Sequence, residues 1–543
     1  MAPFLMMKLP HTSNTSSPSR KAYWAVMSCI ASVAFFAVLE MLYMTQYGIG
    51  IGGDSLYYIG AAVALMEGKG YATCFSGVPQ PVVGWPPGFS ICLAGLGQLM
   101  GDPSAAARWL NSVCFGINTW MVGWVILRYI GWYPVASILS SLFFAMHWRF
   151  LDMHAVAFSE PLFLSCSLIG FAVLLKYFET GSLQLLCASA AVFSLAMLTR
   201  IFGVTFIAAA ALGLLILGNS PIYARFSRTA IFLTISLSPT AVFFVRNLAL
   251  AGSITTVPTN AVCVPSSECA GGLVRFGFGL LWPYEYNFSP KTKWFLYGGW
   301  YGLMLTIVLQ IILAFRRGNL IRPKSFAALT GLCICSYMAL FGYLVFSNLE
   351  CQKLGTMQRY LMPLMPFLLL FLGSLVLSHH VGDQPPISGS RLRVVTIGAA
   401  IMVMAGCAKI IWSCYPTRSV ENQQFTSKSW RSSALVSFVR NLETNATIYA
   451  NRQDALWFHT RRRAEALPPF YDMNNGTAEN ALSYSNTIAN VRRQLEGRGG
   501  YILVFSNAYL HQAELQNSII DSACRSAHRI QLTDGTVYAF RKP

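Results

Sequence analysis

The sequence predicts a polytopic α-helical membrane protein with a small α/β domain at its C-terminal end. Of its 543 residues, 55% are hydrophobic and only 11% are charged, whereas soluble domains carry about 25% charged residues. The mean hydropathy is +0.49. Apolar runs long enough to cross a bilayer recur along most of the chain. This composition excludes a soluble enzyme, a disordered chain and a fibre.

About eleven apolar runs are predicted to be transmembrane helices, because each approaches the roughly 20 residues that a bilayer requires. They cover residues 22–46, 105–129, 133–148, 160–178, 183–199, 201–217, 227–245, 294–315, 325–346, 361–377 and 394–414. The run 85–100 begins Trp-Pro-Pro-Gly and contains Gly95, Gly97 and Gln98. We interpret it as a juxtamembrane or re-entrant helix in the first outer loop.

The chain carries a net charge of +18, from 39 basic and 21 acidic residues. When residues 85–100 are not counted as a span, basic residues such as Arg128, Lys176 and Arg225 share the side of the N-terminus. The positive-inside rule then predicts a cytoplasmic N-terminus and an extracytoplasmic C-terminus, in an inner or plasma membrane. The predicted parts are a tail (1–22), a transmembrane domain (23–414) and an outer domain (415–543).

The outer domain has a soluble composition and alternating elements. Helices are predicted at residues 432–442, 486–496 and 514–527, strands at 447–450 and 501–506, and an edge strand at 537–540. Alternation of this kind is typical of a small α/β domain.

The first outer loop contains Gly53-Asp54-Ser55, followed by an amphipathic pattern that continues to Glu67. Asp54 therefore lies at a predicted helix N-terminus. Aspartate is a favoured N-cap residue, so a capping role is one interpretation. A capped carboxylate that is held in place also suits a general base, and both roles remain open.

The next outer loop contains Ser159-Glu160-Pro161. Ser159 or Glu160 can cap the helix that follows, and Pro161 suits its first turn. Capping alone does not explain why acidic groups gather on this face, since a carboxylate at membrane depth is costly unless it is paired.

Four cationic residues approach the same outer face. Arg200, Arg246, Lys353 and Arg359 each follow or precede an apolar run. A single arginine often only anchors a helix end, but four cationic groups opposed to two acids indicate a binding site. Arginine and lysine are the usual partners of phosphates.

Most of the 14 cysteines lie in apolar runs and are expected to pack as small apolar residues. Cys263 and Cys269 lie in a polar stretch, where a disulfide and two free thiols are both open. The nucleotide-binding, metalloprotease and nucleophile-elbow motifs are absent from the sequence.

These motifs, in this order, resemble the C-type membrane glycosyltransferases, which have the GT-C fold. Within that group the chain is similar to lipid A aminoarabinose transferases, protein O-mannosyltransferases and glycosyltransferases of the lipopolysaccharide core. The resemblance covers residues 22–414. It rests on Gly53-Asp54, Trp85-Pro86-Pro87, Ser159-Glu160-Pro161, Leu198-Thr199-Arg200, Val245-Arg246-Asn247 and Gln358-Arg359-Tyr360.

The resemblance implies an inverting transfer of a sugar from a polyprenyl-phosphate donor to a lipid, glycan or protein acceptor. Asp54 would deprotonate the acceptor, and Glu160 would organise the site. Arg200, Arg246, Lys353 and Arg359 would bind the lipid phosphate. We expect Tyr57, Trp85 and His154 to line the cavity, and the outer domain to help bind the acceptor.

The chain departs from some relatives in the residues that bear on a metal. Asp54 is followed by serine rather than a second acid, and Trp85 replaces a lysine that precedes proline in the aminoarabinose transferases. No cofactor is certain, and a divalent metal (Mg²⁺, Mn²⁺, Ca²⁺ or Zn²⁺) held by Asp54 and Glu160 stays open.

Two other classes of protein remain to be distinguished. A transporter or flippase of a lipid-linked anion usually shows internal repeats and midplane polar groups, which this sequence lacks. A membrane scaffold would not need acids and arginines on one face. Nucleic acid is not an expected partner, because the basic excess divides among inner loops, outer helix ends and the outer domain.

Overall fold

A computed structural model describes residues 19–75, 79–218, 220–254, 323–347, 359–377, 425–468, 471–472, 477–478, 481–506 and 513–540. The chain divides into two compact units, which are treated separately below. The transmembrane unit contains Met1–Gln46, Pro86–Phe89 and Ala107–Ser419, and the outer unit contains Tyr47–Trp85, Ser90–Ala106 and Val420–Pro543. The first loop thus groups with the C-terminal domain, a grouping that the sequence does not predict.

Nine of the eleven predicted runs fall within the described residues, and each of them contains a helix. The helices are α2 (Arg20–Met44), α5 (Pro103–Val125) with the π-helical turn η1 (Ile126–Ile130), α6 (Pro134–Ala145), α8 (Glu160–Thr180), α9 (Leu183–Thr199), α10 (Gly203–Leu217), α11 (Ile222–Ala251), α14 (Pro323–Ser347) and α16 (Met365–Leu377). The runs 294–315 and 394–414 lie outside the described residues.

Five of the described helices are long and apolar enough to cross a membrane. They are Arg20–Met44, Pro103–Ile130, Glu160–Thr180, Ile222–Ala251 and Phe326–Tyr343. The helix α4 (Gly88–Met100) has 13 residues, too few for a span, as predicted for the run 85–100. The run 133–148 differs from its prediction, because α6 ends at Ala145 and a second helix, α7 (Trp148–His154), follows a turn.

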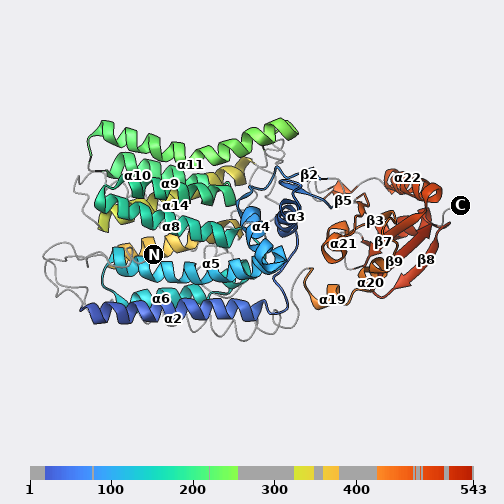
Figure 1. The fold of residues 1–543 in the computed structure, drawn as a ribbon, viewed down its shortest axis with the longest axis horizontal. Coiled ribbons are helices and arrows are strands. Elements are labelled where there is room, and N and C mark those ends of the chain that lie inside the picture. Colours follow the sequence, from blue (N-terminus) through green and yellow to red (C-terminus); the bar gives the residue numbers. More distant parts are fainter. Residues whose placement is uncertain are drawn as a thin grey trace, which may run out of the picture. The chain divides into compact units, whose positions relative to one another are not determined.

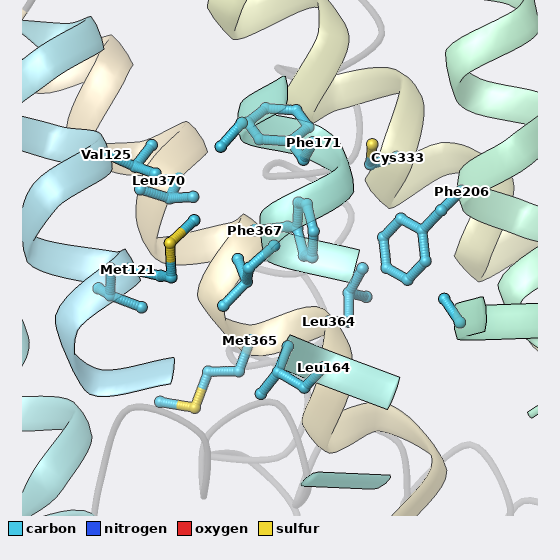
Figure 2. Packing of buried hydrophobic residues seen from close by; sticks show 14 of the residues in the cluster. Met121, Val125, Leu164, Phe171, Phe206, Cys333, Leu364, Met365, Phe367 and Leu370 are labelled. Atoms are coloured by element: carbon cyan, nitrogen blue, oxygen red, sulfur yellow. The ribbon is translucent and has the colours of Figure 1, made fainter. Parts of the chain in front are cut away.

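The helix α16 lies at the centre of the transmembrane unit. Figure 2 shows Phe367 of this helix among side chains from α5, α8, α10 and α14. The ring of Phe367 lies 5.4 Å from that of Phe171 on α8 and 4.7 Å from that of Phe206 on α10. Phe367 is fully buried. The position of α16 is therefore fixed by packing, and with it the position of Arg359, which lies just before it.

A mixed five-stranded sheet forms the core of the C-terminal domain. Its strands are β3 (Ile448–Ala450), β4 (Glu465–Ala466), β7 (Gly500–Phe505), β8 (His528–Leu532) and β9 (Gly535–Phe540). Their order is β4-β3-β7-β9-β8, in which β3 is parallel to both β4 and β7, and β9 is antiparallel to β7 and β8.

The prediction that residues 537–540 form an edge strand is wrong. The strand β9 lies between β7 and β8, with Val537 fully buried, and the edge is formed by β8. The strand β8 is short and mostly exposed. Its sequence therefore lacks the alternation of apolar and polar residues that predicts a strand.

Helices cover both faces of this sheet (Figure 1). The helices α22 (Ala481–Arg498) and α23 (Ala513–Ala523) bury one face, against Ile502 and Val504. The helices α20 (Ala434–Arg440) and α21 (Gln453–Thr460) bury the other, against Leu503 and Phe505. Successive residues of a strand point to opposite faces, so the apolar run of β7 fits a strand that is buried on both sides.

The first loop folds within the outer unit as α3 (Asp54–Met66), a short hairpin of β1 (Ala72–Thr73) and β2 (Gln80–Pro81), and α4. The C-terminal domain forms hydrogen bonds with backbone carbonyls of this loop. The amide of Phe425 donates to the carbonyl of Ile51 at 2.9 Å, and the hydroxyl of Thr426 donates to the carbonyl of Ile49 at 2.8 Å.

Side chains of α21 strengthen this contact. The ring of Trp457 packs edge-to-face on Phe75, 4.8 Å between centroids. Arg461 lies over Trp457 and approaches Asp102 at 4.0 Å. Arg461 has a φ of 55°, and among the described residues it is the non-glycine residue with positive φ. That conformation closes the C-terminus of α21 and turns the arginine toward the loop.

Candidate functional site

Glu160 begins α8 and binds two arginines that lie far away in the sequence. Its oxygen Oε1 forms an ion pair with Nη1 of Arg200 at 2.8 Å and accepts a hydrogen bond from Nε of Arg359. The Glu160 side chain is fully buried, while 11% of Arg200 and 22% of Arg359 are exposed. The predicted association of this acid with arginines is thus present in the structure for Glu160, Arg200 and Arg359.

Aromatic rings flank both guanidinium groups. The guanidinium of Arg359 lies 3.6 Å from the ring centroid of Phe158, and that of Arg200 lies 5.4 Å from the ring of Tyr360. Flat cations are attracted to aromatic faces, and such contacts also limit their rotation. The two arginines are therefore held in place from two sides, by a shared carboxylate and by an aromatic ring each.

Buried amides of α5 hold the loop that leads into Glu160. The Nδ2 group of Asn111 donates to the carbonyl of Val156 at 2.7 Å. Asn118 donates to the carbonyl of Pro161 at 3.3 Å and accepts from the hydroxyl of Ser165 at 2.9 Å. Both asparagines are fully buried. Ser159 occupies the N-cap position of α8 without a side-chain capping bond, so this serine does not form the cap that the sequence suggests.

His154 belongs to the same buried network. Its ring lies 3.2 Å from Nδ2 of Asn118 through one nitrogen and 2.7 Å from the carbonyl of Phe150 through the other. It is fully buried and is not among the residues that line the described pocket. We expected His154 to line a cavity, whereas in the structure it supports the loop before α8.

Of the two other predicted phosphate ligands, Arg246 falls within the described residues. Arg246 lies near the end of α11, where its Nη1 group donates to the side chain of Asn247 at 2.9 Å. Lys353 lies outside the described residues, as do Cys263 and Cys269 of the predicted disulfide.

Asp54 is the first residue of α3 rather than its cap. Gly53 occupies the N-cap position with a φ of 52°, a conformation that glycine adopts at little cost. The hydroxyl of Ser55 closes the turn, since it accepts from the amide of Gly52 at 2.8 Å and donates to its carbonyl at 2.6 Å. The positive end of the helix dipole favours a carboxylate at this place. The interpretation of Asp54 as an N-cap is therefore wrong.

Tyr57 and Trp85, both predicted to line a cavity, stack on each other. Their ring centroids lie 4.0 Å apart with an interplanar angle of 13°. The hydroxyl of Tyr71 donates to the carbonyl of Trp85 at 2.8 Å and holds the start of the Trp-Pro-Pro segment. Burial raises the pKa of Tyr57, and the negative charges of Asp454 and Asp54 raise it further.

A pocket of about 270 Å³ lies in the outer unit beside this stack. Residues of the first loop and of the C-terminal domain line it together. They are Gly53, Leu56, Tyr57, Phe75, Ala450, Asn451, Arg452, Gln453, Asp454, Ala466 and Leu467. Tyr57 is thus among the lining residues of this pocket, and Trp85 stacks on its ring.

The residues 451–454 of this pocket were not predicted from the sequence. They follow the carboxyl end of β3 directly and lead into α21. Ligands of open α/β sheets bind outside the carboxyl ends of parallel strands. The polar run Asn-Arg-Gln-Asp after a predicted strand is the signal that identifies such a site, but only the topology shows that β3 has parallel neighbours.

A divalent metal held by Asp54 and Glu160 stays a prediction. Within the described residues, no group of three His, Cys, Asp or Glu side chains is close enough to hold a metal ion. Two guanidinium groups already bind Oε1 of Glu160, so the charge that would attract a cation is offset. We therefore derive no step through a metal.

No protein-family model matches the chain, and no curated protein is similar to it in sequence. Solved structures are similar in fold. The GT-C fold protein ArnT from Cupriavidus metallidurans, in its apo state, matches with a TM-score of 0.58 at 12% identity. The match covers 96% of this chain and 98% of ArnT. The chain has the GT-C fold.

Other GT-C proteins match over nearly the whole chain as well. ArnT bound to undecaprenyl phosphate matches with a TM-score of 0.58, 13% identity and coverage of 95% and 98%. The arabinofuranosyltransferase AftD from Mycobacteria matches with a TM-score of 0.55 at 11% identity, and the match covers 97% of this chain and 40% of AftD. The oligosaccharyltransferase AglB from Archaeoglobus fulgidus, in complex with an inhibitory peptide and a dolichol-phosphate, matches with a TM-score of 0.52 at 10% identity. That match covers 96% of this chain and 75% of AglB.

These likenesses confirm the predicted fold class, a polytopic GT-C membrane protein with a small C-terminal sheet domain. Because the sequence identities are low, these likenesses establish the fold alone. The roles of individual residues, and the acceptor, are matters for proposal.

Proposed function

We propose that the chain is an inverting glycosyltransferase that moves a sugar from a polyprenyl-phosphate donor to an acceptor at one face of the membrane. The observation that carries the proposal is the pair of arginines bound to Glu160 at the start of α8. A guanidinium group presents a planar fork of N–H donors that matches a phosphate, so Arg200 and Arg359 form a preorganised anion site.

The fold supports this proposal. ArnT and AglB have been solved with undecaprenyl phosphate and with a dolichol-phosphate, and AftD is an arabinofuranosyltransferase. A lipid phosphate moves within the plane of the membrane, so an anion site at the end of a membrane helix suits it. A water-soluble anion would not require such a position.

The reaction assigns one role to each group. The acceptor hydroxyl oxygen attacks the anomeric carbon of the sugar, and its proton passes to the carboxylate of Asp54. The bond between the anomeric carbon and the phosphate oxygen breaks, and its electron pair leaves with the polyprenyl phosphate. Attack opposite the leaving group inverts the configuration. Arg200 and Arg359 stabilise the negative charge that develops on the phosphate.

The test uses the purified full chain in lipid nanodiscs with polyprenyl-phosphate sugars and candidate acceptors. The Asp54→Asn variant should transfer sugar about 10²- to 10⁴-fold more slowly, the usual contribution of a general base. It should bind the polyprenyl phosphate as tightly as the wild type. Equal turnover in the two proteins would remove Asp54 as the base.

A transporter would give a different result. Movement of the intact lipid-linked sugar across a vesicle bilayer, without release of polyprenyl phosphate, would contradict the glycosyltransferase proposal.

A further inference from the structure

The pocket in the outer unit points to a substrate class. Its lining contains two charged residues, Arg452 and Asp454. These bind each other through two parallel contacts, from Nε of Arg452 to Oδ1 at 3.1 Å and from Nη2 to Oδ2 at 3.2 Å. The two charges offset each other, so the pocket suits an uncharged ligand rather than a phosphate or a carboxylate.

The remaining polar groups suit hydroxyls. The Oε1 oxygen of Gln453 is buried and receives no hydrogen bond from the described residues. A buried acceptor left without a donor destabilises a protein by about 1–3 kcal/mol, so a ligand O–H group that reaches this oxygen would be bound favourably. The carboxylate of Asp454 is 35% exposed and can accept from a second hydroxyl.

The side chain of Asn451 has a different role. Its amide donates to the carbonyl of Phe505 at 3.1 Å and accepts from the amide of the same residue at 2.9 Å. These bonds join β3 to β7 beside the pocket and hold residues 452–454 in position. Arg452 is held in turn by the ring of Phe425, which lies 4.7 Å from its guanidinium carbon.

The apolar part of the lining consists of ring faces and small side chains. Tyr57 and Phe75 pack edge-to-face, with centroids 5.6 Å apart, and both line the pocket. Aromatic rings offer broad apolar surfaces at little cost in conformational entropy. A ligand with apolar C–H faces and hydroxyl edges, which is the chemistry of a sugar ring, satisfies both parts of the lining.

The shape of the pocket argues against a peptide. Its volume of about 270 Å³ lies at the small end of ligand pockets, which hold roughly 300–1,000 Å³. A peptide usually binds along a groove or adds a strand to a sheet edge. The neighbouring edge strand, β4, has only two residues, so it offers little backbone for such pairing.

We propose that this pocket binds an uncharged sugar ring of the acceptor, so that the acceptor is a saccharide or carries one. The inference rests on the proposed function, because it assigns the pocket to the acceptor of that reaction. Gly53 lines the pocket and Asp54 follows it in the chain, so the lining begins one residue away from the proposed base. The C-terminal domain thereby supplies Gln453 and Asp454 to acceptor recognition.

The first experiment measures binding without a donor. Saturation-transfer NMR on the full chain in nanodiscs should detect neutral mono- and disaccharides, with weaker transfer in the Gln453→Leu variant. The Gln494→Leu variant is the matched control, because Gln494 is exposed on α22 and bonds Tyr449 at 3.0 Å outside the pocket. It should bind saccharides as the wild type does.

The second experiment measures transfer. With a saccharide acceptor, Gln453→Leu should raise the acceptor KM roughly tenfold, the effect of one lost buried hydrogen bond. The donor KM should stay unchanged, and the apparent Tm should not fall, because the substitution removes a buried acceptor that has no donor. A wild-type acceptor KM in Gln453→Leu, or sugar transfer to a serine peptide and to no saccharide, would overturn the inference.

The two proposals fail in different ways. Saccharide binding that depends on Gln453, combined with no transfer from any polyprenyl-phosphate sugar, would contradict the proposed function and leave the sugar site in place.

Discussion

Glu160 and Glu179 lie at opposite ends of α8, and each of them binds two cationic side chains. Glu160 binds Arg200 and Arg359, while Glu179 binds Arg128 at 2.8 Å and Lys176 at 3.0 Å. Glu160 is the first residue of this 21-residue helix and Glu179 is its last but one. At 1.5 Å per residue they are about 29 Å apart along the axis, close to the roughly 30 Å hydrocarbon layer of a bilayer.

This symmetry supplies a matched pair of variants. Glu160→Gln should lower the transfer rate at least about 100-fold, because the two arginines lose the carboxylate that positions them. It should also destabilise the protein by about 3–5 kcal/mol, the usual effect of breaking a buried ion pair. Glu179→Gln should lower the apparent Tm without changing the donor KM. Equal kinetic effects at the two ends would show that the Glu160 cluster acts only on stability.

The second prediction concerns the shape of the cation. Arg359→Lys keeps the charge but loses the planar fork that matches a phosphate. The donor KM should rise roughly tenfold, which corresponds to one charged hydrogen bond. Arg128→Lys is the control at the opposite end of α8, and its donor KM should equal that of the wild type. Isothermal titration with polyprenyl phosphate checks the same ordering of affinities.

The third prediction concerns the buried amides behind Glu160. Asn118→Leu leaves the ring of His154 and the hydroxyl of Ser165 without one partner each, so the protein should lose about 2–3 kcal/mol of stability. If the loop holds Glu160 in place, the donor KM should rise as well. Ser189→Ala is the comparison, because Ser189 bonds the carbonyl of Gly170 in the middle of α8 at 2.9 Å. That variant should lose stability alone.

The fourth prediction concerns the left-handed residue of α21. Arg461→Gly removes the contacts of the arginine with Asp102 and Trp457 but also relieves the backbone strain at φ 55°. Arg461→Ala removes the same contacts and keeps the strain. The glycine variant should therefore be more stable than the alanine variant by about 1 kcal/mol. Thermal unfolding of both full-length variants in detergent measures the difference, and the opposite order would contradict the assigned conformation.

The fifth prediction concerns acid stability. The pKa of His459 is lowered from 6.5 to about 4, first by burial and then by the charges of Arg440 and Arg461, against the opposing effect of a hydrogen bond to the backbone of Phe425. Between these values the unfolded chain binds a proton that the folded chain does not. The contribution of His459 is therefore complete above about pH 6.5 and is lost as the pH falls through 4.

The His459→Phe variant tests this, because phenylalanine retains the stacking on Trp430. Its apparent Tm should fall less than that of the wild type between pH 7 and pH 4. His528→Phe, a change at an exposed histidine of β8, should leave the acid shift as in the wild type. Parallel curves for all three proteins would be evidence against a buried neutral His459.

The sequence predicts those parts of the fold that depend on composition along the chain. The bounds predicted for residues 183–199 coincide with α9, because apolar length and end residues are local properties. The pairing of Glu160 with Arg200 and Arg359 follows from their shared face, since buried charges require partners. The sequence does not show which of four cationic residues would bind Glu160, because that depends on how α16 packs.

Other features depend on topology that no local pattern contains. The order of strands places β9 inside the sheet, although its residues alternate like those of an edge strand. The pocket combines residues of α3 with residues that follow β3. Tyr57 belongs to the predicted transmembrane domain and residues 451–454 to the predicted outer domain, so no local pattern indicates that they meet.

The bond between Ile49 and Thr426 spans 377 residues, and this separation has a consequence for biosynthesis. At roughly 5–20 residues per second, the ribosome completes the partner of the first loop about 20–75 seconds after the loop itself. Until then neither the wall of the sugar pocket nor the anchor of the Asp54 turn has been made. An interrupted nascent chain would therefore lack the partner of its first loop even after its early helices had entered the bilayer.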